Sequence, residues 1–158
     1  MVVAHGLPDR MMRSAFKSRE QVLELSALLH DGVVSTNRLR FDAKTGELEL
    51  PILIERRDLP PRRVRKLIWI RVVEYPFEPA IVRFRTVRHY RWNREVDLTE
   101  LLVDSIKCSD VASGVELIIS MSEGPVLLIN LRELAIELIR GSSLVFRKVL
   151  RTVQWGRE

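Results

Sequence analysis

The sequence has one cysteine and no long apolar run, and each lack excludes a class of protein. Cys108 is the only cysteine among 158 residues, so the chain cannot form an internal disulfide. The segment after Met1 lacks a secretory apolar region, and together with the lone thiol this predicts a reducing, cytoplasmic location. No apolar stretch approaches the ~18 residues that a membrane-spanning helix requires, so we expect no membrane association.

The motifs of the common enzyme classes are also missing. The sequence contains no G-x-S-x-G, G-x-G-x-x-G, G-x-x-x-x-G-K-[ST] or C-x-x-C pattern. These motifs carry nucleophilic catalysis, dinucleotide binding, nucleotide triphosphate binding and redox or metal chemistry. We therefore expect a protein that is not an enzyme and that needs no cofactor.

Histidine is scarce, with only His5, His30 and His89 in the chain. The adjacent His30 and Asp31 suggest a metal ligand pair, but phosphohydrolase sites of that kind need several further His and Asp ligands. We expect no metal: His30 should end a helix, where a cation favours the helix dipole, and Asp31 should bond local backbone. The pattern around Cys108 predicts a small buried hydrophobe rather than a nucleophile.

Charge is present in abundance but is unevenly distributed. The net charge is +5, yet residues 56–94 hold twelve Lys and Arg against three acids, whereas the remainder holds fourteen against eighteen. Six of the ten aromatic residues lie in the same segment. A basic, aromatic middle is typical of a surface that meets anions. The alternative is that the acidic flanks pair internally with this middle.

The length fits one domain. We expect a flexible N-terminal arm over residues 1–17, a single β-rich domain over 18–140 and a basic amphipathic tail over 141–158. A capping box at Ser18 predicts a helix over residues 19–30. Gly32 is placed to end that helix in a left-handed conformation.

The apolar period then changes from 3.6 to 2, which predicts strands. "VVSTNRLRF" and "ELELPILIE" flank a turn in which Gly46 supplies a positive φ. Pairing Asp42 with Glu47 gathers apolar residues on one face of this hairpin. The same register sets Arg40 against Glu49 on the other face.

Two long strands are predicted over residues 64–75 and 80–92, joined by "PFEP". One face of this pair carries apolar residues among arginines, and a patch of that composition needs a cover. We therefore predict an interaction face made of Trp69, Arg71, Arg83, Arg85, His89 and Arg91.

A third hairpin joins "ELLVDSIKCS" to "GVELIISMS", with Cys108 opposite Val115. "NLRELAIELIRG" fits a helix and a strand equally well. "SSLVFRKVLRTVQW" fits a helix, an added strand or a partner-binding tail. Together these patterns predict an α+β fold: a mostly antiparallel sheet of about six to eight strands with one N-terminal helix, and a C-terminal helix as an option.

The stretch "LSALLHDGVVSTNRLRFDAKTGELEL" is similar to the opening of several small bacterial β-rich families of unknown function, some of them immunity-like. In these families a Leu-His-Asp segment, matched here by Leu29, His30 and Asp31, precedes a hairpin. "GVELIISMSEGPVLLINLRELAIEL" is similar to their closing strands, so about half of the chain is covered. The resemblance implies a β-sheet fold with a strand over residues 133–139, and it implies no catalytic residues.

These observations favour a non-catalytic binding or assembly protein. We expect a homo-oligomer, most simply a dimer, because C2 dimers are the commonest assembly. An acidic protein is a further candidate partner. The alternative is single-stranded nucleic-acid binding, in which arginines hold phosphates and Trp69, Tyr90 or Trp92 stack on bases. An enzyme built on an unfamiliar site is the third possibility.

Overall fold

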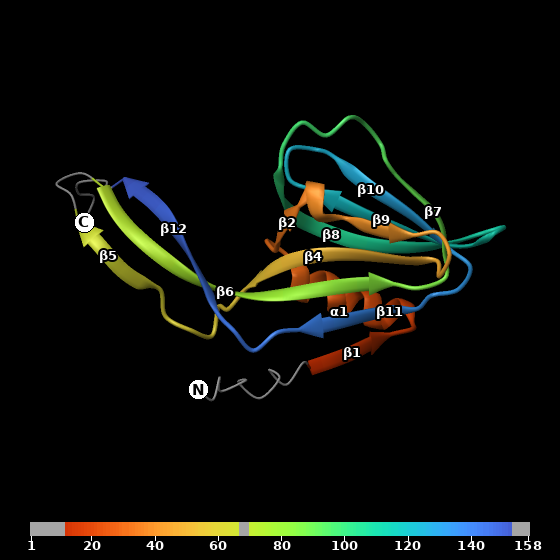
Figure 1. Cartoon of the computed structure of the whole chain (residues 1–158), viewed down its shortest axis with the longest axis horizontal. Coiled ribbons are helices and arrows are strands. Elements are labelled where there is room, and N and C mark those ends of the chain that lie inside the picture. The colour runs from red at the N-terminus through yellow and green to blue at the C-terminus, as the bar shows by residue number, and fades with distance from the viewer. Residues whose placement is uncertain (1–11, 67–69, 153–158) are drawn as a thin grey trace, which may run out of the picture.

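The computed structural model describes residues 12–66 and 70–152, which form one sheet and one α-helix (Figure 1). The helix α1 spans Arg19–Leu29, and a 3-10 turn, η1, spans Thr36–Arg38. The strands are β1 (Met12–Phe16), β2 (Val33–Ser35), β3 (Arg40–Asp42), β4 (Glu47–Glu55), β5 (Arg62–Lys66), β6 (Ile70–Phe84), β7 (Val87–Trp92), β8 (Glu100–Val111), β9 (Gly114–Met121), β10 (Val126–Leu131), β11 (Ile136–Arg140) and β12 (Val145–Thr152).

The mostly antiparallel sheet with one N-terminal helix is confirmed, but the expected six to eight strands are too few. The described residues form a sheet of twelve strands, and its main path runs β1-β11-β6-β4-β2-β8-β9-β10-β7. Several of the additional strands have only three to five residues, which is too short for an alternating pattern to be recognised in the sequence. Among the described residues no helix is long and apolar enough to cross a membrane.

The sheet is so strongly curved that the β3–β4 hairpin contacts strand β7. The ring of Phe41 in β3 lies edge-on to that of Tyr90 in β7, with centroids 5.4 Å apart. The amide of Val87 donates to the carbonyl of Gly46 at 2.8 Å. One continuous core lies inside this curl, and α1 adds Val22, Leu25 and Leu29 to it. Burial of that apolar surface is the main stabilising term of the fold.

The start of α1 and the register of the first hairpin follow the sequence prediction, although η1 divides the strand expected over "VVSTNRLRF" into β2 and β3. The hydroxyl of Ser18 accepts a hydrogen bond from the amide of Gln21 at 3.2 Å. In the hairpin of β3 and β4, Arg40 is opposite Glu49 and Asp42 is opposite Glu47. Hydrophobic pattern and charge pairing specified one register, so the local sequence sufficed here.

The end of α1 differs from the prediction because the left-handed residue is Asp31, with φ of 63°, and not Gly32. Gly32 is required for a different reason. A Cβ atom at this position would lie 2.6 Å from Cδ1 of Ile52 and 2.8 Å from the carbonyl oxygen of Leu29. Gly32 therefore permits close approach between the end of α1 and strand β4.

The predicted hairpin of residues 64–75 and 80–92 is wrong. Strand β6 runs without interruption from Ile70 to Phe84 and passes straight through "PFEP". Its hairpin partner is β5, and β7 leaves β6 after a turn in which Thr86 has φ of 58°. The two prolines suggested a turn, yet each lies where a neighbouring strand leaves the ladder.

Pro76 and Pro79 cost β6 no ladder hydrogen bond. The carbonyl of Pro76 accepts from the amide of Arg56 at 2.9 Å, just beyond the end of β4. The carbonyl of Pro79 accepts from the amide of Gly141 at 2.9 Å, just beyond the end of β11. In an antiparallel strand the N–H and C=O of one residue point to the same neighbour, so each missing N–H faces a strand end.

These strand ends divide β6 into two halves with different neighbours. Strand β4 pairs with residues 77–84 and β11 with residues 80–84, whereas β12 pairs with residues 70–77 and β5 with residues 71–74. We call β5, residues 70–77 of β6 and β12 the β-arm, and the remainder the body. In Figure 1 the β-arm projects from the body as a curved three-stranded ribbon.

The remaining segments settle what the sequence left open. "NLRELAIELIRG" contains strand β11, as the resemblance implied, and the basic tail contributes β12, an added strand. Met12–Phe16, within the expected flexible arm, is strand β1 paired with β11. The hairpin of β8 and β9 is confirmed, but Cys108 is opposite Leu117 and not Val115, because Val111 pairs with Gly114 and the turn is shorter than predicted.

Candidate functional site

Two arginines of the predicted interaction face are neutralised inside the body. Arg83 Nη2 lies 3.0 Å from Oε1 of Glu49, and Arg85 Nη2 lies 2.9 Å from Oε2 of Glu137. The Arg83 side chain is only 20% exposed. The alternative of internal pairing therefore describes these two arginines, which hold neighbouring strands together.

The other residues of that face lie elsewhere. His89 and Arg91 are exposed on β7, which pairs with β10 and shares no ladder with β6 among the described residues. Arg71 belongs to the far end of the β-arm, twelve residues from Arg83, or about 40 Å along an extended strand. Trp69 lies outside the described residues. The predicted residues are therefore not brought together on one face.

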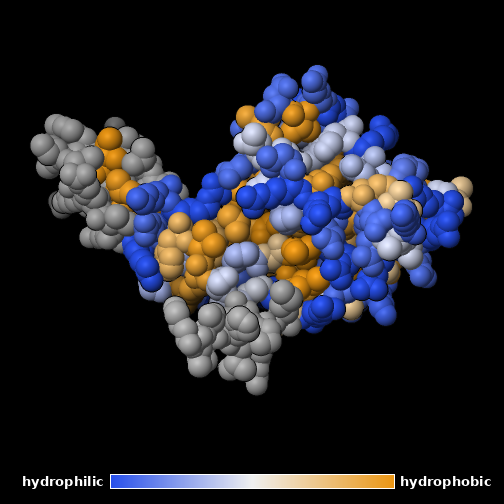
Figure 2. Space-filling model, viewed as in Figure 1, coloured by the Kyte–Doolittle hydropathy of each residue, from blue (hydrophilic) through white to orange (hydrophobic). Residues whose placement is uncertain are grey.

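The β-arm gathers positive charge that the sequence shows in two separate segments. Strand β5 contributes four Lys or Arg residues, β12 contributes three and the β6 portion contributes one, against the single acid Glu74. The tail predicted as basic and the basic middle thus form one structure. Figure 2 shows hydrophilic residues along the β-arm where it leaves the body.

The strand register places these charges in rows across the β-arm. Lys66 and Arg151 are both opposite Arg71, so three cations occupy one row with no acid. Glu74 is instead flanked by Arg62 and Lys148.

Two arginines of the β-arm lie over the faces of aromatic rings near its base. The guanidinium of Arg62 lies 3.7 Å from the ring centroid of Phe146. That of Arg147 lies 5.9 Å from the centroid of Phe77, which is buried. Both contacts are cation–π interactions, and they use the ring faces that a base would need for stacking.

Arg147 also ties the β-arm to the body. Its Nη2 atom lies 2.7 Å from Oε2 of Glu100 at the start of β8. Both side chains are partly exposed, so this ion pair adds little stability. It links β12 of the β-arm to β8 of the body.

A charged cleft of about 630 Å³ lies at the base of the β-arm, where β4 and β11 end. Buried Glu78 accepts two hydrogen bonds from Arg140, at 2.8 and 2.9 Å, and lies 3.5 Å from Arg56. Arg56 in turn donates to both oxygens of Asp58, at 2.8 and 2.7 Å. This hydrogen bonding lowers the pKa of Asp58 to about 2, and the same pairing raises the pKa of Arg56.

The cleft network consists of two arginines and two acids: Arg140, Glu78, Arg56 and Asp58. This balance of charge fits a structural role at the fork, the place where β4 and β11 end beside β6. Each charged group of the chain from Arg140 to Asp58 has a partner of opposite sign. Removing one member would leave a neighbour without its counter-charge, so the four groups act as a unit. We assign this network to holding β4, β6 and β11 together where they separate.

His30 and Asp31 lie beside this cleft and make contacts that need no metal. The Nδ1 atom of His30 is 2.9 Å from the carbonyl oxygen of Asp104, and Oδ2 of Asp31 is 3.0 Å from Nη2 of Arg57. Asp31 thus pairs with a distant arginine rather than with local backbone. Within residues 12–66 and 70–152 no cluster of His, Cys, Asp and Glu has the composition of a metal site.

Cys108 is half-buried and packs against the core from the β8 side. It lies on strand β8, which packs beside α1 and whose Asp110 pairs with Arg19 at the start of that helix. The expectation of a small hydrophobe, rather than a nucleophile, stays a prediction.

Comparison of the chain with family models, curated proteins and solved structures finds no match. The assignment of a site therefore rests on geometry, and the geometry singles out the β-arm. Sequence reasoning recognised the charge of β5 and of β12 but missed their association through β6. The available signal was the similar basic alternation of "RRVRK" and "FRKVLRT".

Proposed function

We propose that the protein is a non-catalytic binding protein whose β-arm holds the phosphate backbone of a nucleic acid. The proposal rests mainly on the charge of the β-arm. This ribbon projects from the body and contains eight Lys or Arg residues but one acid. Arg83, Arg85 and Arg140 of the body pair with glutamates, whereas the β-arm has too few acids to neutralise its cations.

The extent of the charge favours a polymer over a small anion. Residues 70–77 of β6 extend over roughly 26 Å at 3.3 Å per residue. In the strand register Lys66 and Arg151 are opposite Arg71, while Arg63 is opposite Val73 and Arg147 is opposite Tyr75, so five cations recur along these alternate positions of the ribbon. A row of phosphates matches such a distribution better than one carboxylate or phosphate group does.

The aromatic contacts favour binding to the backbone rather than to bases. Phe146 and Phe77 already carry guanidinium groups, so they reinforce the cations instead of offering open stacking faces. Contacts to phosphate position a protein without reading sequence. We therefore expect binding that depends strongly on salt and weakly on sequence, to duplexes as well as single strands.

Assembly of several copies is the second candidate function, and the open edges of the β-arm favour it. Among the described residues β5 and β12 pair with β6 only, so each leaves one edge free for another strand. Charged residues on edge strands oppose such pairing, which is why we place nucleic acid first. A homo-oligomer, most simply a dimer, stays a prediction that light scattering with and without 1 M salt would test.

The test of the first proposal uses fluorescence anisotropy with a labelled duplex and the corresponding single strand of about 25 nucleotides. With about five phosphate contacts, the logarithm of affinity should fall with the logarithm of salt with a slope of about −4 to −5 on the duplex. The variant Lys66→Glu with Arg151→Glu should lower affinity at least tenfold and reduce the slope by about 2.

The matched control is Arg88→Glu with Arg91→Glu, which makes the same change in net charge on exposed residues of β7. This control should retain most of the affinity. An equal loss in both variants would show attraction to net charge alone and would contradict a site on the β-arm. Absence of binding by the native protein at low salt would overturn the nucleic-acid proposal and favour an acidic protein partner.

A further inference from the structure

A groove on the outer face of the sheet has a composition unlike that of the β-arm. It has a volume of about 300 Å³ and crosses β2, β4, β6 and β11. Two apolar rows form its floor: Val33, Leu53 and Pro79 in one, and Pro51, Ile81 and Ile139 in the other. In Figure 2 hydrophobic residues gather near the centre of this view, over β4 and β6.

A glycine and a proline at one end leave space in the groove. Gly141 follows β11 opposite Pro79, and neither extends a long side chain over the sheet. Ile52 and Ala80 border the groove but belong to the core cluster, whereas the residues of the two apolar rows do not. The groove therefore lies on a face of the sheet that the core does not use.

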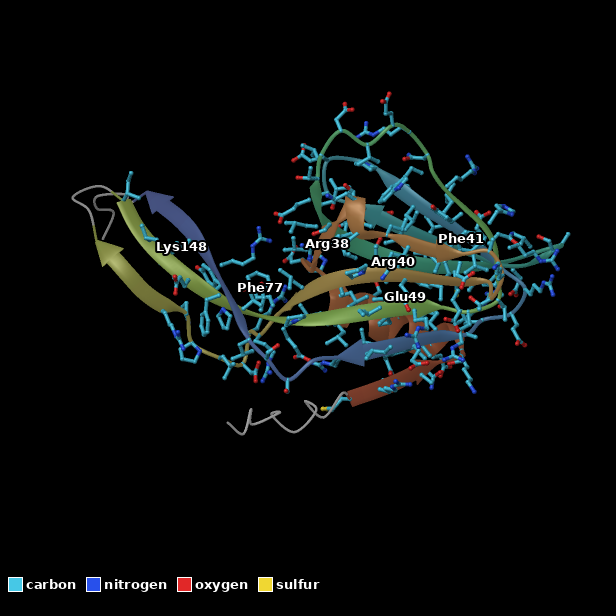
Figure 3. All side chains as sticks on the ribbon, viewed as in Figure 1. Arg38, Arg40, Phe41, Glu49, Phe77 and Lys148 are labelled. Atoms are coloured by element: carbon cyan, nitrogen blue, oxygen red, sulfur yellow. The ribbon has the colours of Figure 1, made fainter. Side chains whose placement is uncertain are left out.

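One end of the groove carries a positive charge without a counter-charge. Arg38, in η1, lines the groove and is exposed, and no acid or hydrogen-bond partner contacts its guanidinium among the described residues. Ser35 lies at the same end. Figure 3 shows Arg38 on the side of the body that faces the β-arm, with Phe77 at the β-arm's base.

The acid nearest in the strand register does not cancel this charge. Glu100 is opposite Ser35 across β2 and β8, but its carboxylate is held by Arg147 at 2.7 Å. Arg38 thus remains the free charge at the end of an apolar groove. A guanidinium beside an apolar surface complements a ligand that joins one anionic group to a hydrocarbon chain.

We propose that the groove binds an unbranched aliphatic carboxylate, with the carboxylate on Arg38 and the chain lying across β4 and β6 toward Ile139. From β2 to β11 the groove spans three inter-strand spacings, about 14 Å, which matches a chain of roughly ten carbons. The volume is at the small end of ligand pockets, in agreement with a slender ligand. This site shares no lining residue with the β-arm. The carboxylate proposal can therefore be tested independently of the nucleic-acid proposal.

The first measurement is isothermal titration calorimetry with sodium hexanoate, octanoate, decanoate and dodecanoate, each below its micelle concentration. Affinity should rise by about fourfold for each added methylene until the groove is filled near ten carbons, and then level off. Binding that shows no dependence on chain length, or no binding of decanoate at millimolar concentration, would overturn the proposal.

The second measurement separates the charge from the groove. Arg38→Gln should lower the affinity for decanoate about tenfold and leave that for decanol unchanged, because only the carboxylate uses the guanidinium. Arg40→Gln, a nearby exposed arginine opposite Glu49, is the matched control and should have no effect. Equal losses in the two variants would contradict a specific role for Arg38.

A third variant tests the floor of the groove. Leu53→Ser removes hydrocarbon from one apolar row and should reduce the gain in affinity per methylene while retaining the preference for carboxylate over alcohol. Circular dichroism of each variant checks that the sheet is intact. An unchanged chain-length dependence in folded Leu53→Ser would place the aliphatic chain elsewhere and refute the assignment.

Discussion

At the scale of single residues, the packing of β4, β6 and β11 where they separate depends on the buried carboxylate of Glu78. The Glu78 side chain is 5% exposed and is shared by Arg140 and Arg56 from two other strand ends. A buried charge is tolerated only when paired and fully hydrogen-bonded. The geometry around Glu78 satisfies that requirement, so its removal has a predictable cost.

We predict that Glu78→Gln lowers the free energy of unfolding by about 3 kcal/mol, because Arg140 loses its counter-charge in a largely enclosed position. Urea denaturation measures this change. The control is Glu49→Gln, whose partner Arg83 keeps a second carboxylate, that of Glu47, at 3.9 Å. The control should cost about 1 kcal/mol or less, and equal effects would show that the enclosure of Glu78 does not matter.

The free energy of unfolding at acid pH should depend on the protonation of Asp58. Its pKa is lowered from 3.8 to about 2 in the folded state, chiefly by hydrogen bonds from Arg56. A lowered folded-state pKa stabilises the protein above pH 3.8, and this contribution is lost as the pH falls toward about 2.

The midpoint of urea unfolding should therefore fall more steeply for the native protein than for Asp58→Asn between pH 3.8 and about pH 2. The Asp58 side chain is 62% exposed, so the difference should shrink in 1 M salt. Parallel curves for the two proteins at low salt would contradict the role given to this pair.

At the scale of elements, the contact between α1 and β4 depends on the absence of a side chain. We predict that Gly32→Ala destabilises the protein by about 1 to 3 kcal/mol, because its Cβ would overlap Ile52 and the carbonyl of Leu29. Thermal unfolding measures the effect. Gly32→Ala combined with Ile52→Val, which removes the methyl group nearest the added carbon, should recover part of the loss.

Strand β6 shows at the same scale how neighbours decide the meaning of proline. Pro76 and Pro79 lie in a continuous strand because their missing donors face the ends of β4 and β11. Had either neighbour continued, a ladder hydrogen bond would be lost and a turn would be favoured. A sequence window around "PFEP" contains no information about where those other strands end.

At the scale of the whole molecule, body and β-arm differ in what stabilises them. The buried core cluster includes Ala80, Val82 and Phe84 from β6 but, among the described residues, no member of the β-arm. Regions with few buried apolar contacts open at lower free energy than the core does. The β-arm is therefore held by its ladders, its cation–π contacts and the ion pair between Arg147 and Glu100.

We predict that amide hydrogens of β5 and β12 exchange at least tenfold faster than those of β9 and β10 in the body. Hydrogen exchange followed by mass spectrometry or NMR checks this expectation. Addition of a DNA duplex should slow exchange in the β-arm selectively if the proposed function holds. Equal protection of body and β-arm in the free protein would contradict the division of the molecule into two parts.

The sequence by itself determined the elements whose stability is local. The capping hydrogen bond of Ser18, the register of Arg40 with Glu49 and the turn at Gly46 depend on residues within a few positions of one another. Their propensities, hydrophobic periods and charge pairs all agreed on one structure. The same holds for the hairpin of β8 and β9, apart from a shift by two residues that preserves the faces of both strands.

Only the tertiary structure decided the course of β6, the addition of β12 and the composition of the candidate sites. Arg83 and Arg71 belong to one strand, but glutamates of β4 and β11 flank the first, whereas cations of β5 and β12 flank the second. Their surroundings are set by strand pairings between segments far apart in the chain. Because the free energy of a long-range pairing depends on the whole arrangement of strands, no local pattern could separate the two arginines.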